Sequence, residues 1–326
     1  MDELNPILPI YKKVQSLLSL QEFHKRVNVI FHDHEAVHYD ELHADMLESL
    51  QEQFDFLASD TELKMRDNKI VSLLDFGCGT ALATQMFLKT SLSQNCQEIT
   101  LFDTSAQMLE RAKAKSKNWS QQVQIIHEQL PDFTGKFDAV MLSSVLHHIP
   151  NLHTFLKNIE SLLRPGGIFI HLQDPNKDSD SDPERIEREL LLKSRMQQQA
   201  VHSSSIKHFL PKKWRNQLNR LLGRKTYIDR INDDLLREKV IRKRLTADDL
   251  WKVTDIQISE SGYGGISMKE LKTVLTNFQL ITHRSYAFYG VLKHDLPADL
   301  IPMEDEWAAK GSLNGRNVAA IWQKIK

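Results

Sequence analysis

The chain has 326 residues, of which 41% are hydrophobic, 42 are basic and 43 are acidic. This length and hydrophobic content fit one large α/β domain with additions and argue against a disordered chain. The formal net charge of -1 argues against a general nucleic-acid-binding protein. Its two cysteines, Cys78 and Cys96, imply no disulfide framework.

The first residues, MDELNPILPIYKK, begin with acidic side chains and lack a long apolar core, so they do not resemble a secretory signal. No apolar run approaches the roughly 18 residues that a membrane-spanning helix needs. We therefore expect a soluble, cytoplasmic protein.

Residues 1–65 are expected to be helical. The segments VQSLLSLQEF (14–23) and DMLESLQEQFDFLA (45–58) both carry apolar residues at the spacing of one helix face. Between them, FHDHEAVHYDELH (31–43) contains four histidines and four acidic residues. Histidine and carboxylate side chains also bind zinc and iron, so this segment is either a metal site or a helix with another role.

Short apolar runs alternate with helical patterns from residue 66 to residue 174. The expected strands are IVSLLDF (70–76), EITLFD (98–103), VQIIHE (123–128), FDAVMLS (137–143) and GIFIHLQD (167–174). Strands that alternate with helices form βαβ units, which predict a parallel sheet covered on both faces.

Residues 175–258 break this alternation with a polar, mainly helical insertion. In residues 259–326, SMKELKTVLTNFQL leads from a helix into a strand near 278–287, and NVAAIWQKI is expected to be the final strand. A helical segment, PADLIPMEDEWAAK, lies between these two strands. The sequence thus divides into four regions: 1–65, 66–174, 175–258 and 259–326.

Two glycines connect the first expected strand to its helix in LLDFGCGTALAT (73–84). Glycine lets the backbone approach a ligand closely at the carboxyl end of a parallel strand. The nicotinamide fingerprint GxGxxG fails here, because Leu82 occupies the third glycine position. Asp75 instead suits a ligand with an amino-acid group. Asp103, at the end of the second strand, can accept both hydroxyls of a ribose, which suits any adenosine ligand and does not by itself separate the two interpretations.

Four segments resemble, in order and spacing, the motifs of class I S-adenosylmethionine-dependent methyltransferases: LLDFGCGTALAT, LFDTSAQMLERAKAK, FDAVMLSSVLHHIPN and LLRPGGIFI. They cover roughly residues 70–172. FQLITHRSYAF and NVAAIWQKI resemble the sixth and seventh strands of the same family. The resemblance implies a doubly wound, seven-stranded, mostly parallel α/β sheet with strand order 3-2-1-4-5-7-6 and an antiparallel last strand.

The resemblance also implies cofactor contacts after successive strands. The turn after the first strand would surround the methionine end, and the acid after the second strand would hold the ribose. The residues that follow it, with those after the third strand, would border the adenine, and two serines after the fourth strand would approach the sulfonium. The implied cofactor-binding residues are Asp75, Gly77, Cys78, Gly79, Asp103, Thr104, Met108, Glu128, Gln129, Ser143 and Ser144.

Some of these positions have a structural alternative. Asp103 could cap the helix that starts SAQMLE, and Cys78 could be a small packing residue. The family usually has Gly-Asp where this chain has His127 and Glu128, which weakens the adenine contact.

Catalytic roles are expected for His147, His148 and Tyr39. A histidine titrates near physiological pH and can act as general base when the acceptor is a hydroxyl or a protonated amine; the alternative is that the ring only packs. In related enzymes the segment before the first strand is a helical lid, often with a pair like Tyr39-Asp40. Tyr39 would then lie within reach of His147 or His148, similar to the Tyr-His arrangement of phosphobase methyltransferases.

We expect no metal site. The segment HEAVH (34–38) satisfies the HExxH spacing of zinc proteases. The rest of the chain describes a different enzyme, however, so we interpret residues 31–43 as a lid. Magnesium-dependent relatives place an Asp-Asn pair after the fifth strand, whereas here Pro175 follows Asp174.

The segment FLPKKWRNQLNRLLGR (209–224) predicts a basic amphipathic helix. The simplest interpretation is a helix packed on the core with its basic face in solvent. The alternatives are peripheral contact with an anionic membrane or a cap over the acceptor; a nucleic-acid platform is the weakest option, because few aromatic residues accompany the charge.

The sequence therefore predicts an enzyme that transfers a methyl group from S-adenosylmethionine to an oxygen or nitrogen atom of a small-molecule acceptor, lipid-like or a secondary metabolite. The product of the cofactor would be S-adenosylhomocysteine. The alternatives are an RNA or protein methyltransferase, or a catalytically silent protein that binds the cofactor as a sensor or scaffold. The oligomeric state does not follow from the sequence.

Overall fold

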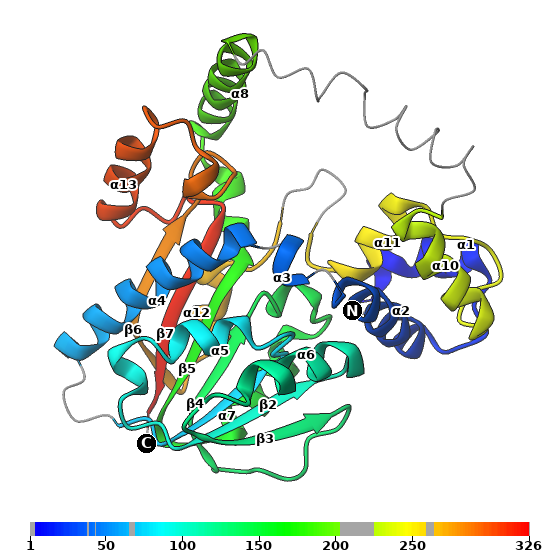
Figure 1. The fold of residues 1–326 in the computed structure, drawn as a ribbon, viewed down its shortest axis with the longest axis horizontal. Helices are drawn as coiled ribbons and strands as arrows, with labels where there is room; N and C mark the ends of the chain where they lie inside the picture. Colours follow the sequence, from blue (N-terminus) through cyan, green and yellow to red (C-terminus); the bar gives the residue numbers. More distant parts are fainter. Residues whose placement is uncertain are drawn as a thin grey trace.

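The computed structural model describes residues 4–37, 39–42, 44–64, 69–202, 225–258 and 264–325. Figure 1 shows a twisted sheet with helices on both faces and a separate group of helices beside it. No helix in these ranges is long and apolar enough to cross a membrane. The predicted basic helix 209–224 lies outside the described residues, as do His38 and His43.

Seven strands form one sheet in the order β3-β2-β1-β4-β5-β7-β6, which confirms the predicted topology. The strands β1 to β5 are parallel, and β7 runs antiparallel to both of its neighbours, β5 and β6. Their bounds are β1 Ser72–Phe76, β2 Glu98–Asp103, β3 Gln122–His127, β4 Phe137–Ser143, β5 Leu163–Pro175, β6 Phe278–Tyr286 and β7 Asn317–Lys324.

Alternating side chains of the strands build two cores, one on each face of the sheet. One face packs against α4 (Ala44–Lys64), α5 (Leu82–Phe87) and α6 (Ala106–Ser116). The other packs against α7 (Leu152–Leu162) and α12 (Met268–Val274). Neighbouring residues of β1 divide between the cores, with Leu73 in the first and Leu74 in the second, as the two-residue period of a strand requires.

A third core belongs to a helical cap, which we define as residues 4–35 together with 225–258. Its elements are η1 (Asn5–Ile7), α1 (Leu8–Val14), α2 (Leu20–Glu35), α10 (Tyr227–Arg237) and α11 (Ala247–Thr254). Fully buried Phe23 and Val27 of α2 pack there with Ile231 and Leu235 of α10. The predicted N-terminal region thus divides: its first helices join part of the insertion, while α4 covers the sheet (Figure 1).

The predicted continuous helix over 14–23 is wrong in its first half. The helix α1 ends at Val14, because Gln15 adopts a left-handed conformation with φ 55° and caps it. Ser19 then starts α2, its side chain accepting a hydrogen bond from the backbone N–H of Glu22.

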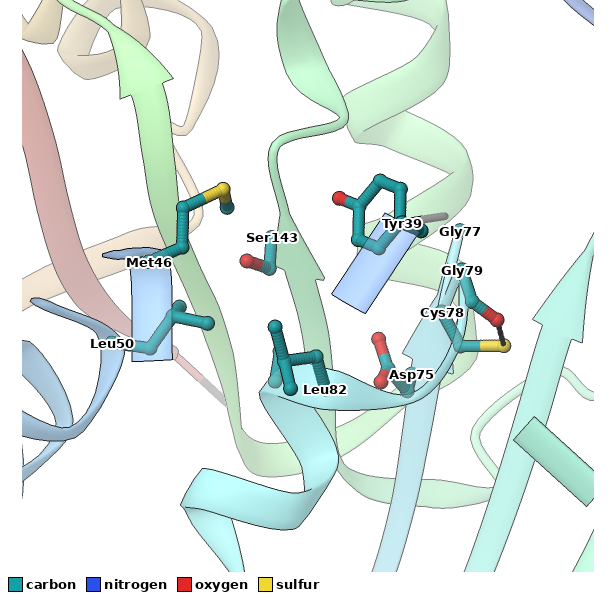
Figure 2. Close-up of a pocket in the computed structure, with 10 residues that line it drawn as sticks. Tyr39, Met46, Leu50, Asp75, Gly77, Cys78, Gly79, Leu82 and Ser143 are labelled. Atoms are coloured by element: carbon teal, nitrogen blue, oxygen red, sulfur yellow. Dashed lines mark hydrogen bonds between the residues drawn. The ribbon is translucent and has the colours of Figure 1, made fainter. Parts of the chain in front are cut away.

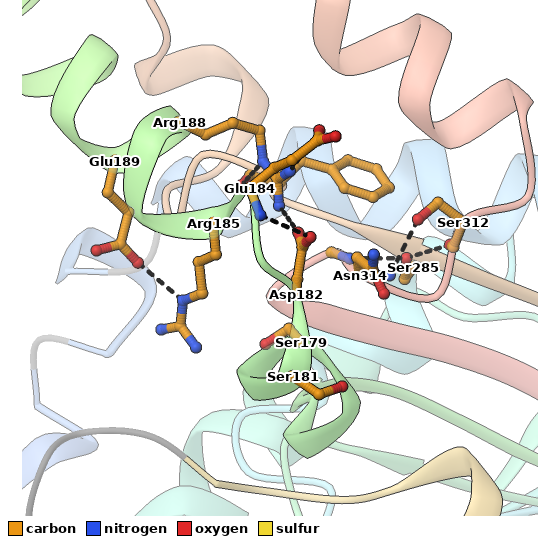
Figure 3. Close-up of polar contacts among 12 residues, drawn as sticks. Ser179, Ser181, Asp182, Glu184, Arg185, Arg188, Glu189, Ser285, Ser312 and Asn314 are labelled. Atoms are coloured by element: carbon orange, nitrogen blue, oxygen red, sulfur yellow. Dashed lines mark hydrogen bonds and ion pairs between the residues drawn. The ribbon is translucent and has the colours of Figure 1, made fainter.

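The remaining elements are helices that precede the strands or lie between them along the chain. They are α3 (Tyr39–Leu42), η2 (Ser91–Ser93), η3 (Leu146–His148), η4 (Lys177–Ser181), α8 (Arg185–His202), η6 (Lys293–Asp295) and α13 (Ile301–Ala309). Figure 3 shows how α8 is attached: the buried Arg188 pairs with Asp182, and its Nε donates to the carbonyl oxygen of Phe288 at 3.0 Å. The guanidinium also lies over the ring of Trp307 in α13.

Candidate active site

The turn after β1 has the tight backbone geometry that the sequence predicted. Gly77 and Gly79 both have positive φ, at 72° and 52°. A Cβ atom at Gly77 would lie 2.7 Å from Cγ2 of Val145, so a larger residue does not fit there. At Gly79 a Cβ atom would meet only Sδ of Met108, at 3.9 Å. The backbone at Gly79 therefore faces open space, where a ligand can approach it.

Asp103 joins this turn to the one after β2. Its Oδ2 accepts from the backbone N–H of Gly79 at 2.8 Å, and its Oδ1 accepts from the N–H of Ser105 at 2.8 Å. Burial raises the pKa of the Asp103 carboxyl, although these backbone donors oppose the rise. Each oxygen keeps a further lone pair, so the carboxylate can still accept two ligand hydroxyls.

A pocket opens between the turn after β1, the end of β4 and the N-terminal segment, with about 330 Å³ of empty space, part of it open solvent (Figure 2). Its walls come from α3, α4, α5 and the ends of β1 and β4. The residues that line it are Tyr39, Met46, Leu50, Asp75, Gly77, Cys78, Gly79, Leu82, Ala83 and Ser143. Six predicted site residues therefore share one cavity.

Asp75 has an unsatisfied oxygen beside this pocket. The side chain is fully buried, and the Thr84 hydroxyl donates to its Oδ2. Its Oδ1 has no hydrogen-bond partner among the described residues. Burial raises the pKa of Asp75 to about 7, and the Thr84 hydrogen bond partly opposes this. A ligand with a cationic donor, such as the ammonium group of an amino acid, fits this oxygen.

The residues predicted to border the adenine gather at the ends of β2 and β3. The Thr104 carbonyl oxygen lies 3.2 Å from Nε2 of His127, and the N–H of Glu128 donates to the carbonyl of Asp103 at 3.2 Å. The exposed Glu128 has a left-handed backbone with φ 63°, while Gln129 donates its N–H to the carbonyl of His127.

The two serines after β4 point in different directions. Ser143 lines the pocket. Ser144 has φ 56°, and its hydroxyl donates to the carbonyl oxygen of Gln173 in β5 at 3.1 Å. Its side chain is thus directed toward the neighbouring strand.

The two adjacent histidines lie in η3, directly after β4, and face the cap. Nδ1 of His147 lies 2.8 Å from Oδ1 of Asp174, a fully buried residue of β5. Nδ1 of His148 lies 2.8 Å from the carbonyl oxygen of Thr254 and 3.3 Å from Oδ1 of Asp255, just after α11. Burial, with a further effect of the neighbouring His147, lowers the pKa of His148 well below its usual range. Neither histidine lines the pocket of Figure 2.

The histidine-rich segment 31–43 connects the cap to the pocket. His34 has its Nε2 2.8 Å from Oδ2 of Asp234 in α10, and His32 has its Nδ1 3.1 Å from Oε2 of Glu35. Tyr39 lines the pocket, and burial raises the pKa of its hydroxyl. The two histidines of this segment that the structure describes, His32 and His34, therefore pair with carboxylates of the cap.

Two carboxylates of the same segment accept hydrogen bonds from the turns after β1 and β2. Oδ1 of Asp33 accepts from the hydroxyl of Ser105 at 2.6 Å. Oδ1 of Asp40 accepts from the hydroxyl of Thr80 at 2.6 Å, and its Oδ2 lies 2.9 Å from Nζ of Lys115. Ser105 lies in the turn after β2 and Thr80 in the turn after β1, so the segment is attached to both turns.

Sequence reasoning missed several of these partners. Asp174 was weighed only as a magnesium ligand, although β4 and β5 are neighbours and their carboxyl ends meet. That adjacency was a usable signal for the His147–Asp174 pair. Asp255 offered no such signal, because no motif marks it. Thr84 and Asp33 lie in segments that the sequence analysis singled out, but the sequence did not indicate their partners.

Comparison with known proteins also indicates a methyltransferase domain. A family model described as a methyltransferase domain matches residues 74–169. Highly reducing polyketide synthase GPY1 of Gibberella fujikuroi is 32% identical over 35% of this chain, and the match covers 5% of that protein. Nodulation protein S of Bradyrhizobium diazoefficiens is 26% identical over 33% of this chain and 51% of its own length. The chain thus spans about half, or much less, of these relatives.

A solved structure of geranyl diphosphate methyltransferase in complex with GPP and sinefungin is similar over 84% of this chain and 77% of its own. The TM-score is 0.41 and the identity 12%.

Proposed function

The chain carries a class I, S-adenosylmethionine-dependent methyltransferase domain, and on that premise we propose that it transfers a methyl group to an oxygen or nitrogen atom of a small-molecule acceptor. The observation that carries the proposal is the pocket beside the glycine turn, with the unsatisfied Asp75 oxygen in its wall and with Asp103 hydrogen-bonded to the same turn. The polyketide synthases among the relatives support a small-molecule acceptor over RNA or protein.

The residues present fit the cofactor at both of its polar ends. Asp103 would accept the ribose hydroxyls with the lone pairs that Gly79 and Ser105 leave free. Asp75 would receive the ammonium group, while the backbone at Gly79 allows close approach. When bound, the sulfonium supplies an electrophilic methyl group to a nucleophile aligned with it.

His147 is proposed as the base that takes the acceptor's proton. An ionised Asp174 can only accept hydrogen bonds, so Nδ1 of His147 donates to it and Nε2 keeps its lone pair. The backbone N–H of His147 also donates to Asp174, at 3.2 Å, which fixes the ring's position. This pairing orients an imidazole for proton abstraction from a hydroxyl or ammonium acceptor. His148 and Tyr39 remain the further catalytic candidates.

Replacing Tyr39 with phenylalanine is expected to lower turnover more than cofactor affinity. The ring would still close the pocket, but the hydroxyl beside the reacting groups would be lost. Steady-state rates and calorimetric affinities measure the two effects. Tyr227→Phe is the control, because that hydroxyl lies in the cap, 3.2 Å from the carbonyl of Phe31. Unchanged turnover in Tyr39→Phe would remove the hydroxyl from the mechanism.

Binding of S-adenosylhomocysteine at pH 7 is expected to release part of a proton from Asp75. Because burial raises its pKa to about 7, many molecules carry a proton there, and an ammonium group at Oδ1 would lower this pKa again. Calorimetry in buffers of different ionisation enthalpy measures the release. Asp75→Asn should bind without it. Equal release by both proteins would assign the proton to another group.

Transfer of label from methyl-labelled cofactor to a cell extract tests the function itself. Label in a small molecule would support the proposal. Label in RNA or protein would favour the first alternative, and bound but untransferred cofactor would favour a silent sensor or scaffold.

A further inference from the structure

Three side chains of types that can bind metal ions lie close together between the end of β4 and the helical cap. One nitrogen of His147, one nitrogen of His148 and one carboxylate oxygen of Asp255 all lie within 4.8 Å of one another. Nε2 of His147 is 3.8 Å from Oδ1 of Asp255. Their side chains are largely shielded from water, with exposed fractions of 11%, 19% and 20%. None of the three belongs to the histidine-rich segment 31–43.

The spacing is close to what a small ion requires. Zn²⁺ binds imidazole nitrogen and carboxylate oxygen at about 2.0–2.2 Å in tetrahedral sites, so ligand atoms lie roughly 3.4 Å apart. The separation of 3.8 Å between His147 and Asp255 already approaches this value. Modest side-chain rotation would bring the three donors around one ion, with a fourth position left for water.

The hydrogen bond behind the imidazole of His147 suits metal binding. Asp174 holds Nδ1 of His147 at 2.8 Å, so the nitrogen with the free lone pair is Nε2, which faces Asp255. A carboxylate behind a ligating histidine fixes the tautomer and strengthens the ligand. For His148, the nitrogen that faces Asp255 is Nδ1, at 3.3 Å, and it also lies 2.8 Å from the carbonyl oxygen of Thr254. An ion bound at this nitrogen would replace the hydrogen that Nδ1 donates to Thr254.

We propose that His147, His148 and Asp255 bind a divalent transition-metal ion of the Zn²⁺ type, and that the ion inhibits methyl transfer. Imidazole with carboxylate selects such ions over Mg²⁺ or Ca²⁺, which prefer oxygen ligands alone. The ion would join η3 of the sheet domain to the end of α11 in the cap. The inhibitory part rests on the proposed function: the ion takes the Nε2 lone pair of His147 that the base needs.

Binding is tested first, without reference to activity. The tag-free full chain is titrated with Zn²⁺ by calorimetry, and with Co²⁺ by visible absorption, which reports coordination geometry. One ion per chain is expected. Asp255→Asn and His148→Gln should each weaken binding at least about tenfold, with melting curves that verify their folding. His153→Ala and Asp248→Asn, which alter exposed groups on α7 and α11, should bind as the wild type does.

Absence of a bound ion in the wild type would overturn the proposal, as would affinity unchanged in both ligand variants. Loss of binding in His153→Ala would assign the ion to the surface instead.

The inhibitory part is then tested with a zinc buffer: turnover should fall as the site fills, a chelator should restore it, and Asp255→Asn should resist inhibition. If turnover instead requires zinc, the proposal that the ion inhibits methyl transfer is wrong. Stoichiometric binding by a chain without any methyl transfer would refute the proposed function and leave the metal site standing.

Discussion

Replacing Asp103 with alanine is expected to weaken S-adenosylhomocysteine binding by at least about 100-fold. The variant loses two charge-assisted hydrogen bonds to the ribose, worth roughly 1.5–3 kcal/mol each, and about 1.4 kcal/mol corresponds to a factor of ten. It also loses the acceptor that holds the N–H groups of Gly79 and Ser105 at 2.8 Å, so the two turns would no longer be tied together. Isothermal calorimetry gives the affinity directly.

The matched control for this variant is Asp132→Ala. Asp132 is exposed and accepts hydrogen bonds from Thr134 in a loop outside the pocket. Its removal should leave cofactor affinity unchanged. A folded Asp103→Ala protein that binds S-adenosylhomocysteine as tightly as the wild type would exclude the ribose assignment.

Replacing His147 with glutamine is expected to reduce turnover by about 10²–10⁴-fold, the usual contribution of a general base, at unchanged cofactor affinity. The affinity should hold because His147 does not line the cofactor pocket. Asp174→Asn should reduce turnover as well, because an amide can present its NH₂ group to Nδ1 and favour the wrong tautomer. Single-turnover rates with labelled cofactor measure the chemical step.

His153→Gln provides the comparison, since His153 is an exposed histidine on the next helix. It should behave as the wild type. If His147→Gln keeps full turnover, direct alignment of acceptor and methyl suffices and no base acts at this position.

The parts of the molecule that follow local patterns were predictable. Strands β2 and β4 coincide with the predicted runs 98–103 and 137–143, because buried parallel strands are nearly continuous apolar segments. Both strands neighbour β1, and the carboxyl ends of the three strands lie at the same edge of the sheet. The strand order was therefore enough to place Asp103 and Ser143 near the glycine turn that follows β1.

Contacts between distant segments could not be predicted in the same way. Asp255 reaches His148 across 107 positions, and Asp33 reaches Ser105 across 72. His148 and Ser105 belong to recognisable motifs, but those motifs do not specify these distant partners. The cap forms because apolar faces of α2 and α10 bury one another, and an amphipathic helix does not specify its partner.

The most direct test of the central claim is a melting curve with S-adenosylhomocysteine, compared with one with NAD. At a concentration 100 times its Kd, a ligand that binds only the folded state adds about 2.7 kcal/mol of stability, which raises Tm by several degrees. The pocket at Asp75 and Gly79, with Asp103 hydrogen-bonded to the same turn, predicts this rise with S-adenosylhomocysteine and none with NAD. A rise with NAD and none with S-adenosylhomocysteine would contradict the assignment of the pocket to an S-adenosyl cofactor.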